Sequence, residues 1–186
     1  MTLGIFAFNA EGIQGAVLQM FNHGITTGAL FLAVGQLYDR THSRSIGDYG
    51  GLHKPMPRFA VFLSIFSIAS FGLPGTANSI GEFLVLIGAS HTSFMRVLLS
   101  MGGIVLAAAY MLWMLQRVVL GQASTSAAAL LPDLSTRETA TLVPLAIMVF
   151  LVGVYPGPLM ELLDASVTSL VQQTALAGPV DVSVLN

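Results

Sequence analysis

The sequence contains no cysteine among its 186 residues. This absence excludes disulfide bonds and cysteine-ligated iron–sulfur clusters within the chain. Charged residues are also scarce, at 9% of the chain, whereas a soluble globular domain carries roughly 25%. A soluble protein with so few charges would lack the polar side chains to cover its surface. Together with a mean hydropathy of +0.80, the composition predicts an integral membrane protein.

Several kinds of functional site are missing as well. The sequence has no phosphate-binding loop, dinucleotide-binding fingerprint or nucleophile elbow. Its four histidines lack metal-ligand spacing, so we expect neither a metal nor a cofactor in this chain. A net charge of −2 argues against a nucleic-acid partner, which would require a basic patch. The N-terminal residues, MTLGIFAFNA, lack the basic region and cleavage site of a signal peptide, and we expect the chain to begin partway through a larger protein.

The apolar segments predict an all-α membrane domain over residues 1–186, with about four membrane-spanning helices. The first span covers about 13–38, which is about 39 Å long at 1.5 Å per residue and crosses a hydrocarbon core of about 30 Å with tilt. The third and fourth spans cover about 97–119 and 139–155. Residues 157–175 place leucine and valine at helical spacing between acidic residues, which makes them a candidate interfacial helix.

The second apolar segment, 57–90, is interrupted at Pro74 and Gly75. As one helix it would be about 50 Å long, which is too long for a straight crossing. Since a Pro-Gly pair interrupts a helix, we predict two half-helices joined by a short unwound segment, with Asn78 or Ser79 capping the second half. The alternative is one full span that ends at the interruption, followed by a short re-entrant helix.

The cations predict the orientation in the membrane. Loop 39–58 carries four of the seven cations and region 117–138 carries two. With alternating spans, both regions lie on one side, and only Arg96 lies on the other. Because cytoplasmic loops are enriched in lysine and arginine, we expect both regions to face the cytoplasm.

Glu82 is an acidic residue inside an apolar half-helix. An acid at mid-membrane costs about 2.5–3.5 kcal/mol on insertion scales, so it needs a partner, water or a proton. Burial and the nearby helix N-terminus act on its carboxyl group in opposite directions, which allows it to load and release a proton near neutral pH. Glu82 is therefore our first candidate for proton translocation. The alternative is a structural acid that caps its own half-helix near an interface.

His23 lies within the first span on a row of polar residues. Helical spacing places Gln19, His23, Thr26 and Thr27 on one face. Imidazole titrates near pH 6.5, so it takes up and passes on a proton at little energetic cost. We predict that His23 is a second proton-translocation residue and that Gln19, Thr26 and Thr27 are a candidate polar pathway. The alternative is a neutral histidine that is hydrogen-bonded to another helix.

Several blocks of this sequence resemble one family. They are residues 11–24 (EGIQGAVLQMFNHG), 35–44 (GQLYDRTHSR), 50–52 (GGL) and 72–75 (GLPG), the last leading to 81–83 (GEF). In their order and spacing, these blocks resemble the antiporter-like, proton-pumping subunit of respiratory complex I, an NADH:quinone oxidoreductase, of the chain M or subunit 4 type. The resemblance covers nearly the whole chain but only the C-terminal part of the family's fold.

The resemblance implies that Glu82 is the terminal proton residue of the family's second broken helix and that His23 belongs to its hydrated central axis. The family's first broken helix, with its lysine, has no counterpart in this sequence.

The resemblance also implies a non-redox, proton-translocating subunit of NADH:quinone oxidoreductase in a bacterial inner membrane. Flavin and iron–sulfur clusters would lie in other subunits, and the partners would be other membrane subunits of complex I and the lipid bilayer. The alternatives are a subunit of a multi-subunit Na⁺/H⁺ antiporter and a structural membrane scaffold.

Overall fold

The computed structural model describes residues 1–121 and 130–176, and within these residues the ordered elements are helical, as the sequence predicted. The elements in chain order are α1 (Thr2–Ile5), α2 (Ala10–Thr41), η1 (Ile46–Asp48), α3 (Pro57–Ser70), α4 (Ala77–Ser90), α5 (Phe94–Leu115), the π-helical turn η2 (Gln116–Leu120), α6 (Thr136–Val154) and α7 (Gly157–Leu176).

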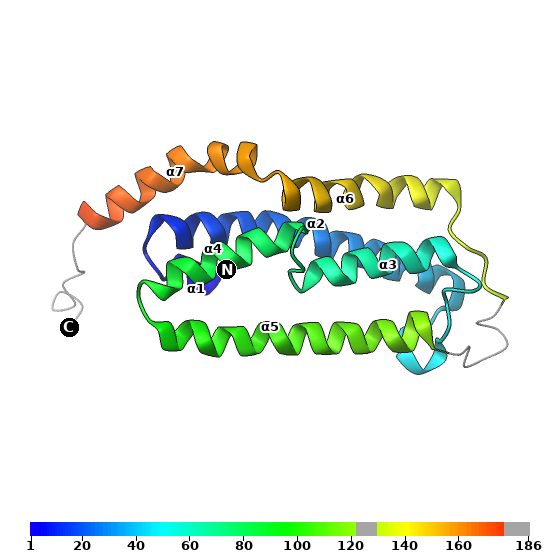
Figure 1. The fold of residues 1–186 in the computed structure, drawn as a ribbon. Coiled ribbons are helices and arrows are strands. Elements are labelled where there is room, and N and C mark those ends of the chain that lie inside the picture. The colour runs from blue at the N-terminus through cyan, green and yellow to red at the C-terminus, as the bar shows by residue number, and fades with distance from the viewer. Residues whose placement is uncertain (122–129, 177–186) are drawn as a thin grey trace, which may run out of the picture.

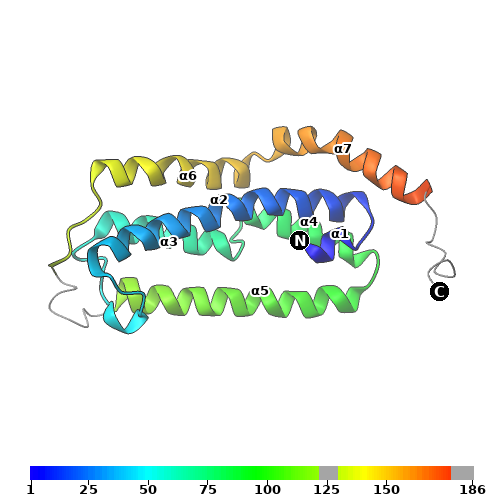
Figure 2. The same ribbon diagram turned by 180° about the vertical axis from the view of Figure 1, so that it is seen from behind.

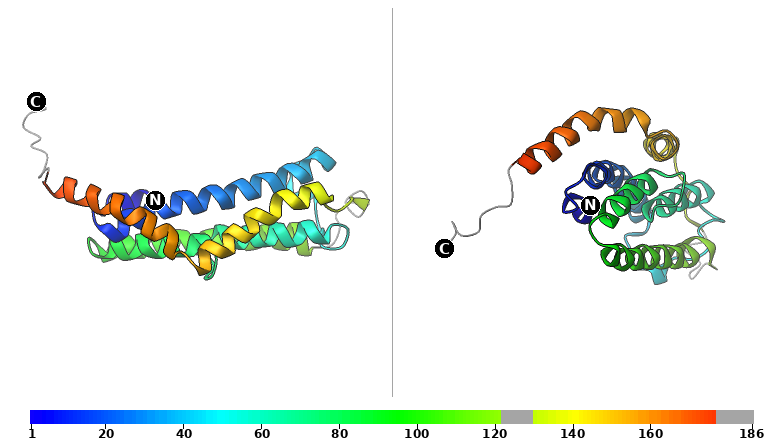
Figure 3. Two further views of the ribbon diagram at one scale, coloured as in Figure 1. Left: turned by 90° about the horizontal axis from the view of Figure 1, so that it is seen from above. Right: turned by 60° about the vertical axis from the view of Figure 1, so that its left-hand side comes forward.

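The helices form an elongated bundle. In the views of Figures 1 and 2, α2, α3 and α4 lie between α5 on one side and α6 on the other. Helix α7 continues from α6 and bends away from the bundle towards its C-terminal end (Figure 3). The main apolar core gathers side chains of α2, α3 and α6 together with the end of α5 and η2.

The broken helix is confirmed. Helix α3 ends at Ser70 and α4 begins at Ala77, so that the chain is non-helical around Pro74 and Gly75. The N-cap of α4 is Thr76, so the expected cap at Asn78 or Ser79 is wrong. Gly75 adopts a positive φ of 90°, which turns the chain sharply and lets the helix start directly after Thr76. Asn78 and Ser79 therefore lie inside its first turn.

Among the described residues, three helices are long and apolar enough to cross a membrane: α2, α5 together with η2, and α6. Helices α3 and α4 have 14 residues each, which is about 21 Å apiece at 1.5 Å per residue. Neither half would span a hydrocarbon core of about 30 Å, but the two in sequence do. By length, the described helices are thus sufficient for the four crossings that the sequence predicts, one of them broken.

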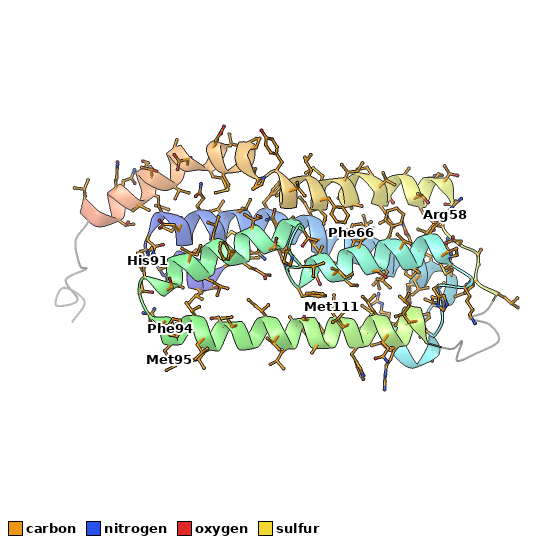
Figure 4. All side chains as sticks on the ribbon, viewed as in Figure 1. Arg58, Phe66, His91, Phe94, Met95 and Met111 are labelled. Carbon is orange, nitrogen blue, oxygen red and sulfur yellow. The ribbon has the colours of Figure 1, made fainter. Side chains whose placement is uncertain are left out.

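Helix α5 has few buried side chains, and large apolar residues such as Phe94 and Met95 lie on the outside of the bundle (Figure 4). An apolar helix of this kind needs lipid or protein around it, because soluble proteins rarely expose so large an apolar surface.

Helices α2 and α4 cross at glycines. A Cβ atom at Gly88 would overlap the backbone of Gly12, and one at Gly81 would overlap Gln19. A Cβ atom at Gly15 would come within 2.7 Å of the backbone nitrogen of Val85. The two backbones therefore approach each other more closely than any side chain would allow, as in the small-residue contacts of membrane helices.

One end of the bundle is held by an ion pair. Both guanidinium Nη atoms of Arg40 donate to the Glu138 carboxylate at 2.7 Å, which joins the C-terminal end of α2 to the N-terminal turn of α6. The neighbouring Asp133 accepts hydrogen bonds from the backbone N–H groups of Arg58 and Phe59, at 3.0 and 3.2 Å. This carboxylate thereby caps α3 at its N-terminal end, where the first backbone N–H groups of a helix lack intrahelical partners.

The two cation-rich regions meet at this end. The backbone carbonyl of Val118 in η2 accepts a hydrogen bond from the N–H of Leu52, and that of Val119 accepts one from the N–H of His53, both at 3.2 Å. Residues 122–129 of region 117–138 lie outside the described residues.

Candidate functional site

The Glu82 side chain lies inside the helix break. Its Oε1 atom accepts a hydrogen bond of 3.3 Å from Nε2 of Gln19 on α2. A Cβ atom at Gly72 would overlap Glu82 Oε2, so the carboxylate packs directly on the backbone of the segment between α3 and α4. Glu82 is half-buried. The break therefore makes room for a carboxyl group beside the unwound segment between two apolar half-helices.

A cavity of about 310 Å³ opens beside this carboxyl group. It extends from α2 and α4 to α5, and its lining residues are Met1, Leu3, Gln19, Glu82, Val85, Leu86, Ser100 and Ile104. The volume is enough for several water molecules, each of which occupies about 30 Å³ in the liquid. Water in this space would give Glu82 a partner for proton exchange that the apolar walls cannot supply.

The predicted polar row on α2 divides into two faces. Gln19 and Thr26 are buried, at 7% and 0% exposure, whereas His23 is exposed and Thr27 is only half-buried. At about 100° per residue, Thr26 lies about 20° from Gln19, while His23 and Thr27 lie about 40° and 80° away in the opposite direction. The predicted polar row therefore contains residues on both sides of the boundary of the buried face of α2.

His23 therefore does not meet Glu82 in the described bundle. The nearest polar partner of its ring is Thr27, whose hydroxyl lies 3.2 Å from Nε2 and 3.3 Å from Nδ1. The pair faces outward from α2. A proton passed to or from His23 would come from groups outside this bundle, because the described helices bring no acid or base to it.

Three buried polar residues near the break were not among the predicted site residues. Asn22 is fully buried and donates from Nδ2 to the backbone carbonyl of Ala77 at 2.6 Å. Asn78 and Ser67 are buried at 1% and 0% exposure. Asn22 could have been found, because it is three residues from Gln19 and four from Thr26 on the same face. Nothing in the sequence marks Ser67 as a buried residue near the break, since an isolated serine in an apolar helix is common.

The described residues contain no group of three or more His, Asp or Glu side chains that could hold a metal ion. What the site offers is one carboxyl group that accepts a hydrogen bond from the neutral amide of Gln19. Such an arrangement suits the uptake, storage and release of a proton, because ionisable residues within membrane segments mark polar pathways.

Comparison with known proteins gives the family. Residues 1–107, more than half of the chain, match the sequence profile described as "NADH:quinone oxidoreductase/Mrp antiporter, TM". The chain belongs to the NADH:quinone oxidoreductase/Mrp antiporter transmembrane family. The resemblance seen in the sequence blocks is thereby confirmed, and the matched residues include Glu82 and the whole of the broken helix.

Relatives within this family carry the names of complex I subunits. The chain is 45% identical over 172 residues to NADH-quinone oxidoreductase subunit M of Rhodobacter capsulatus, an alignment that covers 92% of this chain and 34% of the relative. It is 41% identical over 172 residues to NADH-ubiquinone oxidoreductase chain 4 of Marchantia polymorpha, covering 92% and 35%. The chain thus spans about a third of the length of these relatives.

A solved structure agrees with this assignment. A chain of respiratory complex I from Thermus thermophilus with bound NADH superposes with a TM-score of 0.79 at 32% sequence identity, covering 89% of this chain and 36% of that chain. The family and the helices long enough to cross a bilayer together make this chain a membrane protein.

Proposed function

We propose that this chain is part of the proton-translocating membrane subunit of an NADH:quinone oxidoreductase of the complex I type. Electron transfer elsewhere in the assembly would drive proton movement through this chain, which contains no cysteine for iron–sulfur ligation. Flavin and iron–sulfur clusters would belong to other subunits. Its partners would be other membrane subunits of complex I and lipid, in a bacterial inner membrane with the cation-rich loops in the cytoplasm.

The position of Glu82 is the observation that carries this proposal. Its carboxylate packs on Gly72 inside the break, accepts a hydrogen bond from Gln19 and borders a cavity of about 310 Å³. A broken helix is tolerated in a membrane only inside protein or beside a water-filled space. In this proposal Glu82 is a terminal proton-binding residue, and His23 is a second one that exchanges protons with groups beyond this bundle.

The test is Glu82→Gln in the native membrane assembly. The glutamine amide has nearly the same shape as the carboxyl group but cannot bind or release a proton near neutral pH. In inverted membrane vesicles, the variant is expected to assemble normally and to lose NADH-driven acidification, measured by quenching of a pH-sensitive dye. Glu161→Gln, at an exposed position on α7, is the control and should pump normally. Normal pumping by the Glu82 variant would contradict the proposal and favour a structural scaffold.

A subunit of a multi-subunit Na⁺/H⁺ antiporter is the second candidate, because the matching family includes Mrp antiporters. The same vesicles separate the two functions. An antiporter would move protons when sodium chloride is added without NADH, and that movement would disappear in the Glu82 variant. A redox-driven pump would respond to NADH and not to the sodium gradient.

A further inference from the structure

Two cavities adjoin at the end of the bundle that carries the cation-rich regions. The smaller cavity, of about 270 Å³, lies among α2, α3 and α5, and the larger cavity, of about 760 Å³, lies beside η1 and η2. Ile46 and Tyr49 line both cavities. We propose that the two cavities bind one anionic phospholipid, with an acyl chain in the smaller cavity and the phosphate at its rim, held by Arg44 and Arg117.

The smaller cavity suits an acyl chain. Its lining is mostly apolar and includes Leu30, Val34 and Leu37 of α2, Leu63 of α3, and Met111 and Met114 of α5. From Leu30 to Leu37 this wall extends about 10 Å at 1.5 Å per residue, which is about two-thirds of one leaflet of a hydrocarbon core about 30 Å thick. Met111 faces the bundle from α5 (Figure 4). Val34 is 43% exposed, so an acyl chain can enter from the outside of the described bundle.

The polar end of the smaller cavity is formed by Arg44 and Ser43. Arg44 is exposed, and its guanidinium carbon lies 4.8 Å from the centroid of the Tyr38 ring. Asp48, four residues further along the chain, accepts a hydrogen bond from the Ser43 hydroxyl, and the described residues include no ion pair between Asp48 and Arg44. An aromatic ring contacts the flat face of a guanidinium and leaves its N–H groups directed outward, which suits a phosphate.

A second cation lies in the larger cavity. Arg117 lines this cavity together with Trp113, and its guanidinium carbon lies 4.1 Å from the centroid of the Trp113 ring. Within the part of the chain that the structure describes, the ion pair is that of Arg40 with Glu138. Arg44 and Arg117 therefore keep their charges for an outside ligand. Because tryptophan and tyrosine are enriched at the level of the lipid head groups, both cations lie at a depth where they meet phosphates.

Charge and shape together select the occupant. A free phosphate would satisfy the two cations but would leave the apolar cavity empty. A zwitterionic lipid would fill the apolar cavity, but its quaternary ammonium group would be repelled by two arginines. An anionic phospholipid such as phosphatidylglycerol matches both parts of the site, since basic pockets between membrane helices bind anionic head groups.

Photo-crosslinking tests this site in the native membrane assembly. The assembly is reconstituted into phosphatidylcholine vesicles that contain a small fraction of phosphatidylglycerol with a photoactivatable acyl chain, and the crosslinked residues are identified by mass spectrometry. We expect labels on Val34, Met111 and Met114, several-fold more than from phosphatidylcholine with the same photoactivatable chain. An excess of unlabelled phosphatidylglycerol should remove these labels, whereas inorganic phosphate should not.

Arg44→Gln combined with Arg117→Gln removes both positive charges from the site. In this double variant, we expect labelling by the phosphatidylglycerol probe to fall to the level of the phosphatidylcholine probe. Arg58→Gln is the matched control, because Arg58 is an exposed cation at the same end of the bundle that lines neither cavity (Figure 4). The control should keep the preference for phosphatidylglycerol.

Three results would overturn the proposal: no labels on the apolar cavity, equal labelling by the two probes, or an equal loss of preference in Arg58→Gln. Displacement of the probe by inorganic phosphate would also overturn it, because the ligand would then be a free anion. If the double variant fails to assemble, the comparison of the two probes on the unchanged protein still decides the question. None of these measurements depends on Glu82→Gln, so the lipid site and the proposed function are tested separately.

Discussion

Replacing Gly72 by alanine would move the Glu82 carboxylate without altering its chemistry. Gly72 has a positive φ of 73°, and a Cβ atom there would overlap Glu82 Oε2 and lie 2.9 Å from Cδ. Since the carboxylate is the end of a flexible side chain, it would move by about 1 Å to reach ordinary van der Waals separation. The hydrogen bond from Gln19, already 3.3 Å long, would then be lost.

Two separate costs follow from this substitution. Holding alanine in the left-handed region costs about 1–2 kcal/mol of stability. Displacing a group that transfers protons by about 1 Å can lower a rate by as much as about 100-fold. Gly75→Ala separates these costs, because Gly75 has a similar φ of 90° and its Cβ would meet nothing within 4 Å. Both variants should lose similar stability, and only Gly72→Ala should lose most of its proton transfer.

The assay compares the two variants in inverted membrane vesicles at equal amounts of assembled protein. NADH oxidation and acidification are recorded together, so that pumping is expressed per electron transferred, and thermal unfolding is followed on the purified assembly. We expect Gly72→Ala to pump about tenfold more slowly than Gly75→Ala at matched stability. Equal pumping by the two variants would refute the reasoning that the position of the Glu82 carboxylate controls proton transfer.

Two further predictions concern the packing of the bundle. Arg40→Lys replaces the bidentate contact with Glu138 by a single point charge. It should lower the free energy of unfolding by about 1–3 kcal/mol. Thermal unfolding measures this loss, and an unchanged melting temperature would contradict the prediction. Gly88→Ala would force α4 away from Gly12 and lower the free energy of unfolding by about 1–3 kcal/mol. Gly102→Ala is the control and should be neutral or stabilising, because its Cβ would have nothing within 4 Å. Equal stability of the two variants would show that α2 and α4 are not in close contact.

Composition and local chain chemistry were enough to predict the helices and the break. Long apolar segments define membrane helices because the bilayer fixes their length. Pro74 interrupts the second one together with Gly75, which turns the chain at a positive φ. The end of each half-helix was harder to predict. The sequence offered Asn78 and Ser79 as caps, but the backbone turn at Gly75 decided that α4 begins after Thr76.

The candidate site was predictable only in part. Glu82 stands out because an acid is costly inside apolar sequence, but its contact with Gly72 depends on how the broken segment folds back. The placement of His23 shows a second limit. Helical periodicity indicates which residues share a face to within about 40°, and the packing of α4 on α2 decides which of them are buried. The sequence alone could not separate His23 from Gln19 on these grounds.

The glycine contacts between α2 and α4 have a consequence for how, in the proposed function, a redox event elsewhere in the assembly would reach Glu82. Because the two backbones touch at Gly12, Gly15 and Gly88, these helices have no compressible side chains between them and should move together as one piece. The unwound linker is also held by backbone packing, against Gly153 of α6. A signal that alters the surroundings of the carboxyl group would then travel through α3 or α5. Pairs of labels placed on the helices should therefore record a change in the distance between α4 and α5 during turnover, while the distance between α2 and α4 stays constant.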